Sequence, residues 1–232
     1  MSPKTQDPIV AAIGLSRSVE TGSGKITLLD NVDLAIAPGD RVGCAGPSGS
    51  GKSLTLRAIA MLDPVDCGEV LWRGSSVAPS RVPEFRRDVC YVPQRMATFE
   101  GTVRETLQMP FQLASWTCRK YDEQAIVRSL ATLKRAPSFL DKTARELSGG
   151  ESQVVRLLLS LSAGPSVLLL DEPTAAMDGE MARAVETLIQ TWVEAASSRA
   201  FVWISHSEEQ LARVATRRVT MEGGRLGLRS TR

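Results

Sequence analysis

The sequence predicts an α/β fold, with a core of parallel strands and an inserted α-helical region. Short apolar runs of strand type alternate with helical patterns in both terminal parts of the chain. One of these runs, Val167–Leu170, is continuously apolar, as expected of a strand that is buried on both faces of a parallel sheet. Between about residue 95 and residue 163 the chain is rich in helix formers and lacks convincing strands, so this stretch is the predicted insertion.

The individual elements follow from local patterns. β-rich runs, one of them closed by a Pro-Gly-Asp turn, predict strands over Ile9–Leu15, Val32–Ala37, Arg41–Ala45, Val70–Trp72, Val89–Val92, Val167–Leu170 and Phe201–Ile204. Helical spacing of apolar residues predicts helices from Gly51 to about Leu62, over Tyr121–Leu133 and over Glu151–Leu161. Asp178 is the expected N-cap of a further helix, and Ser207 with Gln210 forms a capping-box pattern before the last one.

Composition excludes several classes of protein. The chain has 232 residues, with 28 basic and 26 acidic side chains and a net charge of +2, which gives no electrostatic case for nucleic-acid binding. Its 4 cysteines form no CxxC pair, which argues against a disulfide or zinc framework and favours a reducing compartment. The most apolar stretch, Leu157–Leu170, is too short and interrupted to span a membrane, and the first residues resemble no secretory signal. We therefore expect a cytosolic chain that reaches a membrane only through a partner.

A glycine-rich segment between a predicted strand and a predicted helix matches the phosphate-binding pattern G-x-x-x-x-G-K-[ST]. Its glycines would let backbone N–H groups curl around a phosphate, and the helix N-terminus would add its positive end. Lys52 would hold the β- and γ-phosphates, and Ser53 would bind Mg²⁺. The segment consists of Gly46, Pro47, Ser48, Gly49, Ser50, Gly51, Lys52 and Ser53.

Acidic and polar residues follow other predicted strands at the same edge of the sheet. Asp171 suits the Mg²⁺ shell, and Glu172 suits a general base for attacking water. Two carboxylates after a strand are more often solvated turn residues, but a nucleotide-hydrolysing site requires both this pair and the phosphate loop. We expect His206 to contact the γ-phosphate and the Gln94 amide to reach both Mg²⁺ and water.

A second helix start has the chemistry of an anion site. Ser148, Gly149 and Gly150 open a helix in the inserted region and leave bare amides at its N-terminus. By itself this pattern favours an ordinary capped helix. Because the chain already has a phosphate loop of its own, we interpret the second terminus as a site for another molecule's nucleotide.

Taken in order, these motifs resemble those of the ATP-binding subunit of an ABC transporter over nearly the whole chain. The resemblance assigns the following motifs: Walker A at Gly46–Ser53, the Q-loop at Gln94, the signature at Leu147–Gln153, Walker B ending at Asp171 with Glu172, the D-loop at Ala175–Asp178 and the switch histidine at His206. It implies a P-loop NTPase with a RecA-like parallel core, an N-terminal antiparallel β subdomain and an inserted α-helical subdomain. The single domain would span residues 1–232, with the helical subdomain at about 95–163 and the remainder at 1–94 and 164–232. Within the family, the segment Gly101–Leu113 resembles the short ATPases that are paired with bacterial iron-export permeases.

Three positions depart from the family pattern. Val19 stands where the family stacks an aromatic ring on adenine, so we expect a weaker contact with the base. Ala175 stands where a D-loop serine is common, which would remove one polar contact across a dimer. Leu54 replaces a threonine after Ser53 within the nucleotide-binding segment and is interpreted as a packing residue.

The resemblance also implies partners and a mechanism. Two ATP molecules would bridge a head-to-tail homodimer, between Walker A of one protomer and Ser148-Gly149-Gly150 of the other, with D-loop residue Asp178 also at the nucleotide. Ser53, Gln94 and Asp171 would hold Mg²⁺. The subunit would drive a separate multi-span permease at the inner face of the cell membrane, with iron export as the narrower assignment.

Two other functions compete with transport. A soluble ABC ATPase that acts as an assembly or scaffold factor, as in iron–sulfur cluster biogenesis, is the alternative, because its signature is similar. A nucleic-acid-handling ATPase is disfavoured, because the chain has neither long coiled-coil insertions nor a second cassette.

The segment that follows Gln94 is unusually apolar for a stretch beside a catalytic edge. Most of its apolar side chains are expected to fill the core of the helical subdomain. We expect Met96 and Phe99 instead to line an exposed groove that receives a short cytoplasmic helix of the permease. The apolar residues are Met96, Phe99, Val103, Leu107, Met109, Pro110, Phe111, Leu113 and Trp116.

Overall fold

The protein is described by a computed structural model, which covers residues 7–22, 24–94, 100–112 and 120–228. One sheet is antiparallel and has the strand order β2-β1-β4-β5: β2 (Gly24–Ile36), β1 (Val10–Thr21), β4 (Cys67–Trp72) and β5 (Ser75–Ser76). The other has the order β10-β9-β3-β8-β7-β6: β10 (Arg225–Leu228), β9 (Arg217–Glu222), β3 (Arg41–Ala45), β8 (Ala200–Ile204), β7 (Val167–Asp171) and β6 (Val89–Val92). All its neighbouring strands run parallel except the β9–β10 hairpin.

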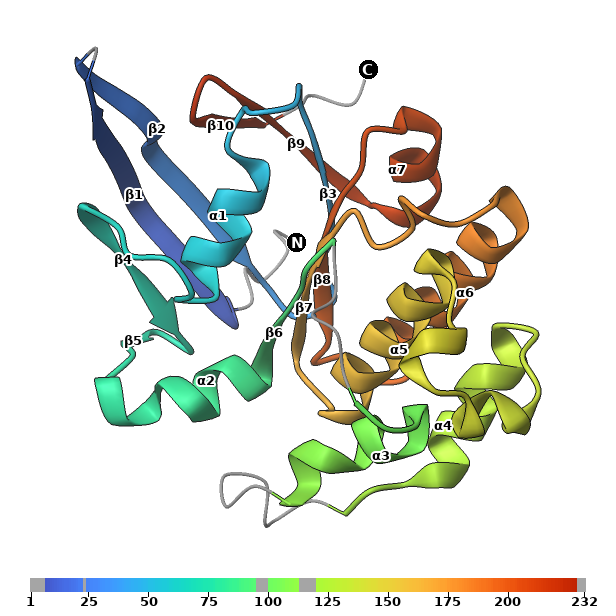
Figure 1. Cartoon of the computed structure of the whole chain (residues 1–232). Helices are drawn as coiled ribbons and strands as arrows, with labels where there is room; N and C mark the ends of the chain where they lie inside the picture. Colours follow the sequence, from blue (N-terminus) through green and yellow to red (C-terminus); the bar gives the residue numbers. More distant parts are fainter. Residues whose placement is uncertain (1–6, 23, 95–99, 113–119, 229–232) are drawn as a thin grey trace, which may run out of the picture.

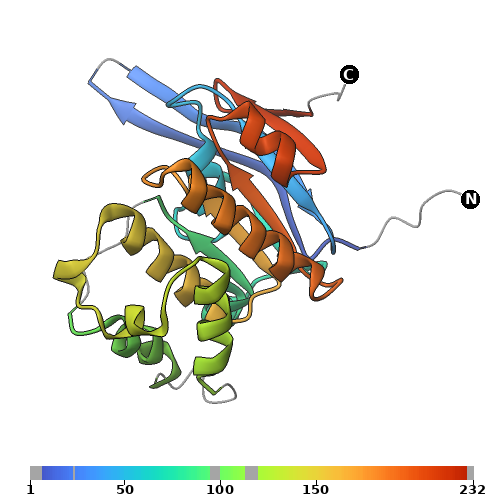
Figure 2. The same ribbon diagram turned by 90° about the vertical axis from the view of Figure 1, so that its right-hand side faces the viewer.

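Helices cover both faces of the six-stranded sheet (Figures 1 and 2). Helix α1 (Lys52–Ile59) lies between the two sheets, and α2 (Val82–Asp88) leads into β6. The opposite face is covered by α5 (Gly149–Ser162), α6 (Gly179–Glu194) and α7 (Glu208–Val214). Helices α3 (Val103–Gln108) and α4 (Glu123–Thr132) pack against α5, and α4 also packs against α6.

The central strands are buried on both faces. In β7, Val167 and Leu169 pack into the cluster that contains α1, whereas Leu168 and Leu170 pack into the cluster formed with α5 and α6. All four side chains have 0% exposure. Alternate side chains of β7 thus face two different parts of the core. Both sets are therefore apolar along Val167–Leu170.

The predicted fold class is confirmed, and the strands β3 and β6 have the predicted bounds. Strands β1, β2 and β4 are longer than expected, and β5, β9, β10, α2 and α3 were not predicted. Helix α1 ends at Ile59 rather than near Leu62, because Met61 has a φ of 55°, which is not helical.

The capping box predicted at Ser207 is only half formed. Ser207 Oγ accepts a hydrogen bond from the Gln210 amide at 3.2 Å. The Gln210 side chain does not return to Ser207, because it donates instead to the buried carboxylate of Glu186 at 2.9 Å and to Thr174 at 3.0 Å. A buried carboxylate needs such donors more than an exposed helix start does.

The apolar segment after Gln94 divides in two. Val103 and Leu107 are fully buried, which confirms the core interpretation for these two residues, whereas Met109 is 53% exposed. Met96, Phe99, Leu113 and Trp116 lie outside the described residues, so the docking groove at Met96 and Phe99 stays a prediction.

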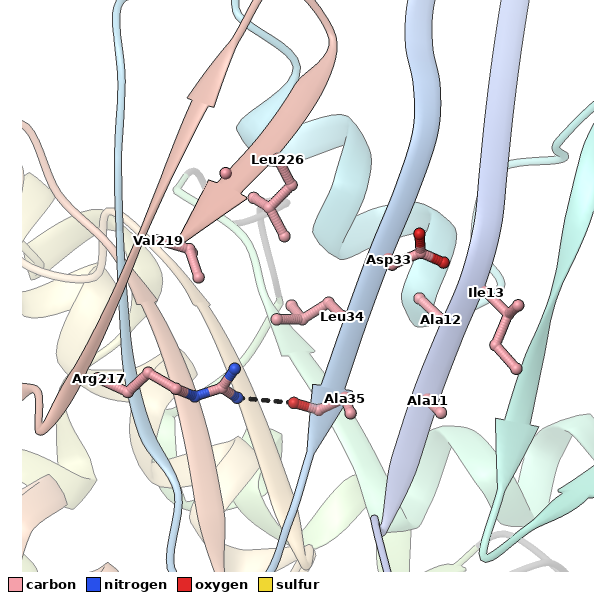
Figure 3. A pocket seen from close by; sticks show the side chains of 10 residues that line it. Ala11, Ala12, Ile13, Asp33, Leu34, Ala35, Arg217, Val219 and Leu226 are labelled. Carbon is pink, nitrogen blue, oxygen red and sulfur yellow. Dashed lines mark hydrogen bonds between the residues drawn. The ribbon is translucent and has the colours of Figure 1, made fainter. Parts of the chain in front are cut away.

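A cavity of about 380 Å³ separates the β1–β2 hairpin from β9 and β10 (Figure 3). Arg217 of β9 reaches across it and donates a hydrogen bond to the main-chain oxygen of Ala35 on β2 at 2.7 Å. The same guanidinium pairs with Asp40 at 2.8 Å. Arg217 therefore ties the edge of the antiparallel sheet to the six-stranded sheet.

Candidate active site

The candidate site forms where four parallel strands end. Val92 pairs with Leu170, Asp171 with Ile204, and Cys44 with Ile204, so the carboxyl ends of β6, β7, β8 and β3 lie at one edge. The chain leaves this edge at Gly46, Gln94, Glu172 and His206. Ligands of open α/β sheets bind at such edges.

The phosphate loop is shaped by glycine at its start and by an uncapped helix at its end. Gly46 has a φ of 145°, and a Cβ there would lie 2.2 Å from the main-chain oxygen of Met221. Gly51 is the N-cap of α1 and supplies no side-chain acceptor, so the amides of the first turn are free of a capping side chain. Bare amides at a helix N-terminus favour an anion.

Lys52 is held inside the loop. Its Nζ donates hydrogen bonds to the main-chain oxygens of Gly46 and Pro47, both at 2.8 Å, and the residue is 6% exposed. Cys44 lies behind the loop on β3, where burial raises the pKa of its thiol to about 12 against the opposing effect of Lys52. The thiol therefore stays neutral and leaves the ammonium charge of Lys52 available to an anion.

Asp171 is a buried carboxylate with two hydroxyl donors. Ser53 Oγ donates to Asp171 Oδ1 at 3.0 Å, and the Tyr91 hydroxyl donates to Oδ2 at 2.9 Å. Asp171 is 4% exposed. Burial, together with the charge of Asp171, raises the pKa of Tyr91, so the phenol stays a donor. Sequence reasoning missed Tyr91, because nothing in a strand pattern shows that its side chain reaches a carboxylate on the next strand.

The donor set at Asp171 fits Mg²⁺. The Ser53 hydroxyl and the Asp171 carboxylate are hard oxygen ligands, which this ion prefers. The hydrogen bond between Ser53 and Asp171 brings their oxygens to 3.0 Å, as two ligands of one ion would require.

Glu172 is fixed through both its backbone and its side chain. It has a φ of 48°, unusual for a residue with a side chain, and its amide donates to the main-chain oxygen of Ile204 at 3.2 Å. Its Oε1 lies 2.9 Å from His206 Nε2, and Oε2 accepts from Gln94 Nε2 at 3.2 Å. The structure thus brings together the three side chains that the sequence places around the reacting water.

A pocket of about 330 Å³ opens between the phosphate loop and this carboxylate. Val19 is not among its lining residues; it pairs with Ile26 in the β1–β2 hairpin, while Leu28 of the same hairpin lines the pocket. Sequence reasoning missed Leu28. The lining residues are Leu28, Ser48, Gly49, Gly51, Lys52, Ser53, Leu54, Glu172 and His206.

The signature residues start a capped helix away from this pocket. Ser148 Oγ accepts from the Glu151 amide at 3.2 Å, and Glu151 Oε2 accepts from the Ser148 amide at 3.0 Å. Ser148, Gly149 and Gly150 do not line the pocket of their own chain. The capped helix start is confirmed, whereas its nucleotide contact stays a prediction.

Asp178 is confirmed as the N-cap of α6, because its Oδ1 accepts from the Met181 amide at 2.8 Å. Its contact with a nucleotide stays a prediction.

Two residues of α5, Gln153 and Arg156, reach the catalytic edge, which the sequence did not indicate. Both contact main-chain atoms of residues that are distant in the sequence.

A phosphate loop at the end of β3, with the buried Asp171 and the partly exposed Glu172 at the end of β7, defines a P-loop NTPase. The model of the ABC transporter family matches residues 29–175, and the chain belongs to this family. Its ATP-binding domain is an ATPase domain of the ABC type.

Named relatives agree with this assignment. The chain is 31% identical to the "Probable iron export ATP-binding protein FetA" of Escherichia coli (strain K12), over 82% of both chains. It is 38% identical to "Protein STAR1" of Oryza sativa subsp. japonica, over 90% of this chain and 58% of that protein. The chain spans from 46% to 85% of the length of such curated relatives.

A solved structure supports the fold. The ATP-binding cassette MJ0796, described as a dimer in a post-hydrolysis state with ADP and Pi, superimposes with a TM-score of 0.82 at 25% identity. The match covers 96% of this chain and 100% of that one.

In the described part of this chain, no helix is long and apolar enough to cross a membrane.

Proposed function

We propose that this subunit is the motor of a transporter, which dimerises head-to-tail around two ATP molecules and drives a separate membrane permease. One observation carries the proposal: the signature helix start lies outside the nucleotide pocket of its own chain, and the Ser148 side chain caps the Glu151 amide, not the amides of Gly149 and Gly150. A second copy would supply the missing nucleotide. The dimeric form of the similar cassette MJ0796 supports the same arrangement.

Each residue of the edge would then have a role. Lys52 would bind the β- and γ-phosphates, and Glu172 would take the proton of the attacking water. His206 and Gln94 would orient the Glu172 carboxylate and this water. Ser53, Asp171 and Gln94 would hold Mg²⁺, which would neutralise charge on the phosphate oxygens. Residues 95–163 would act as a helical subdomain that moves against the rest of a single domain over 1–232.

A narrower proposal concerns which substrate the transporter carries and where the subunit lies in the cell. The similarity to FetA, a probable iron export ATP-binding protein, supports metal export with iron as the transported substrate. The subunit would then lie on the cytoplasmic face of the cell membrane, held by a multi-span permease. A scaffold factor of the iron–sulfur type would bind no such permease.

The test is co-purification with the product of an adjacent permease gene. The tagged subunit is expressed with that membrane protein, extracted in detergent and captured. We expect the permease to be retained, and the ATPase rate per subunit to change when it is present. A subunit that never retains the permease, but purifies with soluble proteins, supports the scaffold alternative.

A further inference from the structure

Helix α5 holds two loops of the catalytic edge through side chains on one of its faces. Gln153 Nε2 donates to the main-chain oxygen of Gln94 at 3.1 Å, and Gln153 Oε1 accepts from the Ala176 amide at 3.2 Å. Arg156, one turn further along, donates from Nη1 to the main-chain oxygen of Pro93. Positions i and i+3 share a helix face, so one surface of α5 serves both loops.

The first of these loops, at Pro93 and Gln94, lies beyond the strand pairing of the sheet. The pairing of β6 with β7 ends at Val92, so the carbonyls of Pro93 and Gln94 lie beyond the ladder. Ala176 lies in the segment between Glu172 and α6. A primary amide can donate to one loop and accept from the other at once, which neither a carboxylate nor a hydrocarbon can do. Gln153 is 5% exposed, so losing either hydrogen bond would leave a buried polar group unsatisfied, which costs free energy.

Arg156 is an unusual neighbour, because it is buried without a counter-charge. It is 6% exposed, pairs with no carboxylate in the described part of the chain, and its Nε has no hydrogen-bond partner there. Burial lowers the pKa of Arg156. Its guanidinium donates to the Pro93 carbonyl, so in the described part of the chain this group serves the loop and not an ion pair.

The start of α5 also touches the second loop directly. A Cβ on Gly150 would lie 3.0 Å from the main-chain oxygen of Ala176. The glycine that bares the signature amides therefore also allows α5 to approach this segment closely. A shift of the signature helix would displace the backbone at Gln94 and at Ala176 together.

We propose that Gln153 is a positioning residue that couples the two ATP sites of the dimer, with Arg156 as its support. This inference rests on the proposed head-to-tail dimer. When the start of α5 engages the partner's nucleotide, Gln153 sets the position of Gln94, whose side chain holds Glu172 at 3.2 Å in its own site. Engagement at one nucleotide is thereby transmitted to the general base at the other.

The test compares Gln153→Ala and Gln153→Glu with Gln190→Ala. Gln190 on α6 also donates to a main-chain oxygen, that of Arg213 at 3.0 Å, but far from the α5 contacts, so its loss controls for a missing helix–loop bond. Gln153→Glu can still accept from Ala176 but can no longer donate to Gln94, which separates the two contacts.

We expect both Gln153 variants to bind Mg-ATP as monomers within about twofold of the parent, because no pocket residue changes. The Hill coefficient of ATPase activity should fall from near the two-site limit of about 2 toward about 1. The rate kcat should fall about 10- to 100-fold through loss of alignment. Hydrogen exchange at Ala176 should accelerate in Gln153→Ala but not in Gln153→Glu.

A Hill coefficient and kcat within about twofold of the parent in both variants would overturn the coupling role. If Gln153→Ala unfolds, the same measurements are made on Gln153→Glu and Arg156→Lys, after their melting temperatures have been shown to equal that of the parent. A Glu172→Gln protein that stays monomeric in Mg-ATP refutes the dimer itself. A dimer whose variants keep full cooperativity refutes only the inference.

Discussion

His206 Nε2 lies 2.9 Å from Glu172 Oε1, and the backbones of the same two segments are also joined, because the Glu172 amide donates to Ile204 at 3.2 Å. The proposed base is therefore fixed to the end of β8 through its main chain and its carboxylate. His206 lies just past the end of β8, and Gln94 adds a contact from the segment that follows β6. These two partners of the carboxylate therefore lie just beyond strand ends of the parallel sheet.

Replacing His206 should impair turnover more than binding. In His206→Ala, Glu172 loses the imidazole 2.9 Å from its Oε1 and keeps Gln94, while the phosphate loop is unchanged. We expect kcat to fall about 100-fold, within the range for general acid–base groups, and the dissociation constant for Mg-ATP to change less than about threefold. Steady-state kinetics measure kcat, and equilibrium binding on the same preparation measures the dissociation constant. A large loss of affinity with normal kcat would contradict this role.

Replacing Lys52 should have the opposite signature. Lys52→Ala removes the ammonium group whose Nζ lies at the loop carbonyls, and a hydrogen bond to a charged group contributes about 1.5–3 kcal/mol. We expect ATP affinity to fall about 10- to 150-fold, which isothermal titration measures. Lys25→Ala, on an exposed part of β2, is the matched control.

Base selectivity should be weak. An aromatic–base stack is worth about 1–3 kcal/mol, and the hairpin offers only aliphatic side chains at Val19 and Leu28. We expect modest ATP affinity and appreciable competition by GTP. Val19→Tyr should raise the preference for ATP if Val19 faces the base, whereas an effect of Leu28→Tyr alone would assign the contact to Leu28. A strong ATP preference in the parent would show that another group reads the adenine.

The ion pair between Glu186 and Arg213 should make stability depend on pH. Burial of Glu186 acts to raise its pKa, but hydrogen bonds from Arg213 at 2.7 Å and from Gln210 outweigh it and hold the pKa below the usual 4.5. A lowered pKa stabilises the fold above the unfolded value, and this contribution is lost as the pH falls through the folded value. We expect Glu186→Gln to lower the melting temperature at pH 7 and to flatten its decline below about pH 4.5. Equal slopes for both proteins would contradict the assignment.

Continuous apolar runs explain why much of the core could be predicted. Strands β3, β6, β7 and β8 need apolar residues on both faces, and this leaves an unambiguous pattern. The far half of the β1–β2 hairpin leaves none, because the residues from Gly24 to Thr27 are all exposed. Its backbone pairing with Ser18–Thr21 across the hairpin, not its own sequence pattern, makes it a strand.

The site divides in the same way. The phosphate loop, Asp171, Glu172 and His206 were predicted, because their chemistry is local and follows from motif and strand end. Tyr91 was missed, and Gln153 was identified only as the last residue of the signature. Their partners are distant in sequence: Tyr91 reaches Asp171, and Gln153 reaches Gln94 and Ala176. Only the folded chain brings these groups together.

The most direct test of the account is the association state of Glu172→Gln in Mg-ATP. The substitution removes the proposed base and keeps the phosphate loop, so ATP should bind, turnover should fall by at least about 100-fold, and the bridged dimer should persist. Size-exclusion chromatography with light scattering should show about twice the monomer mass with Mg-ATP, and the monomer mass with Mg-ADP or in the Lys52→Ala, Glu172→Gln double variant. A monomer under saturating Mg-ATP would contradict the account.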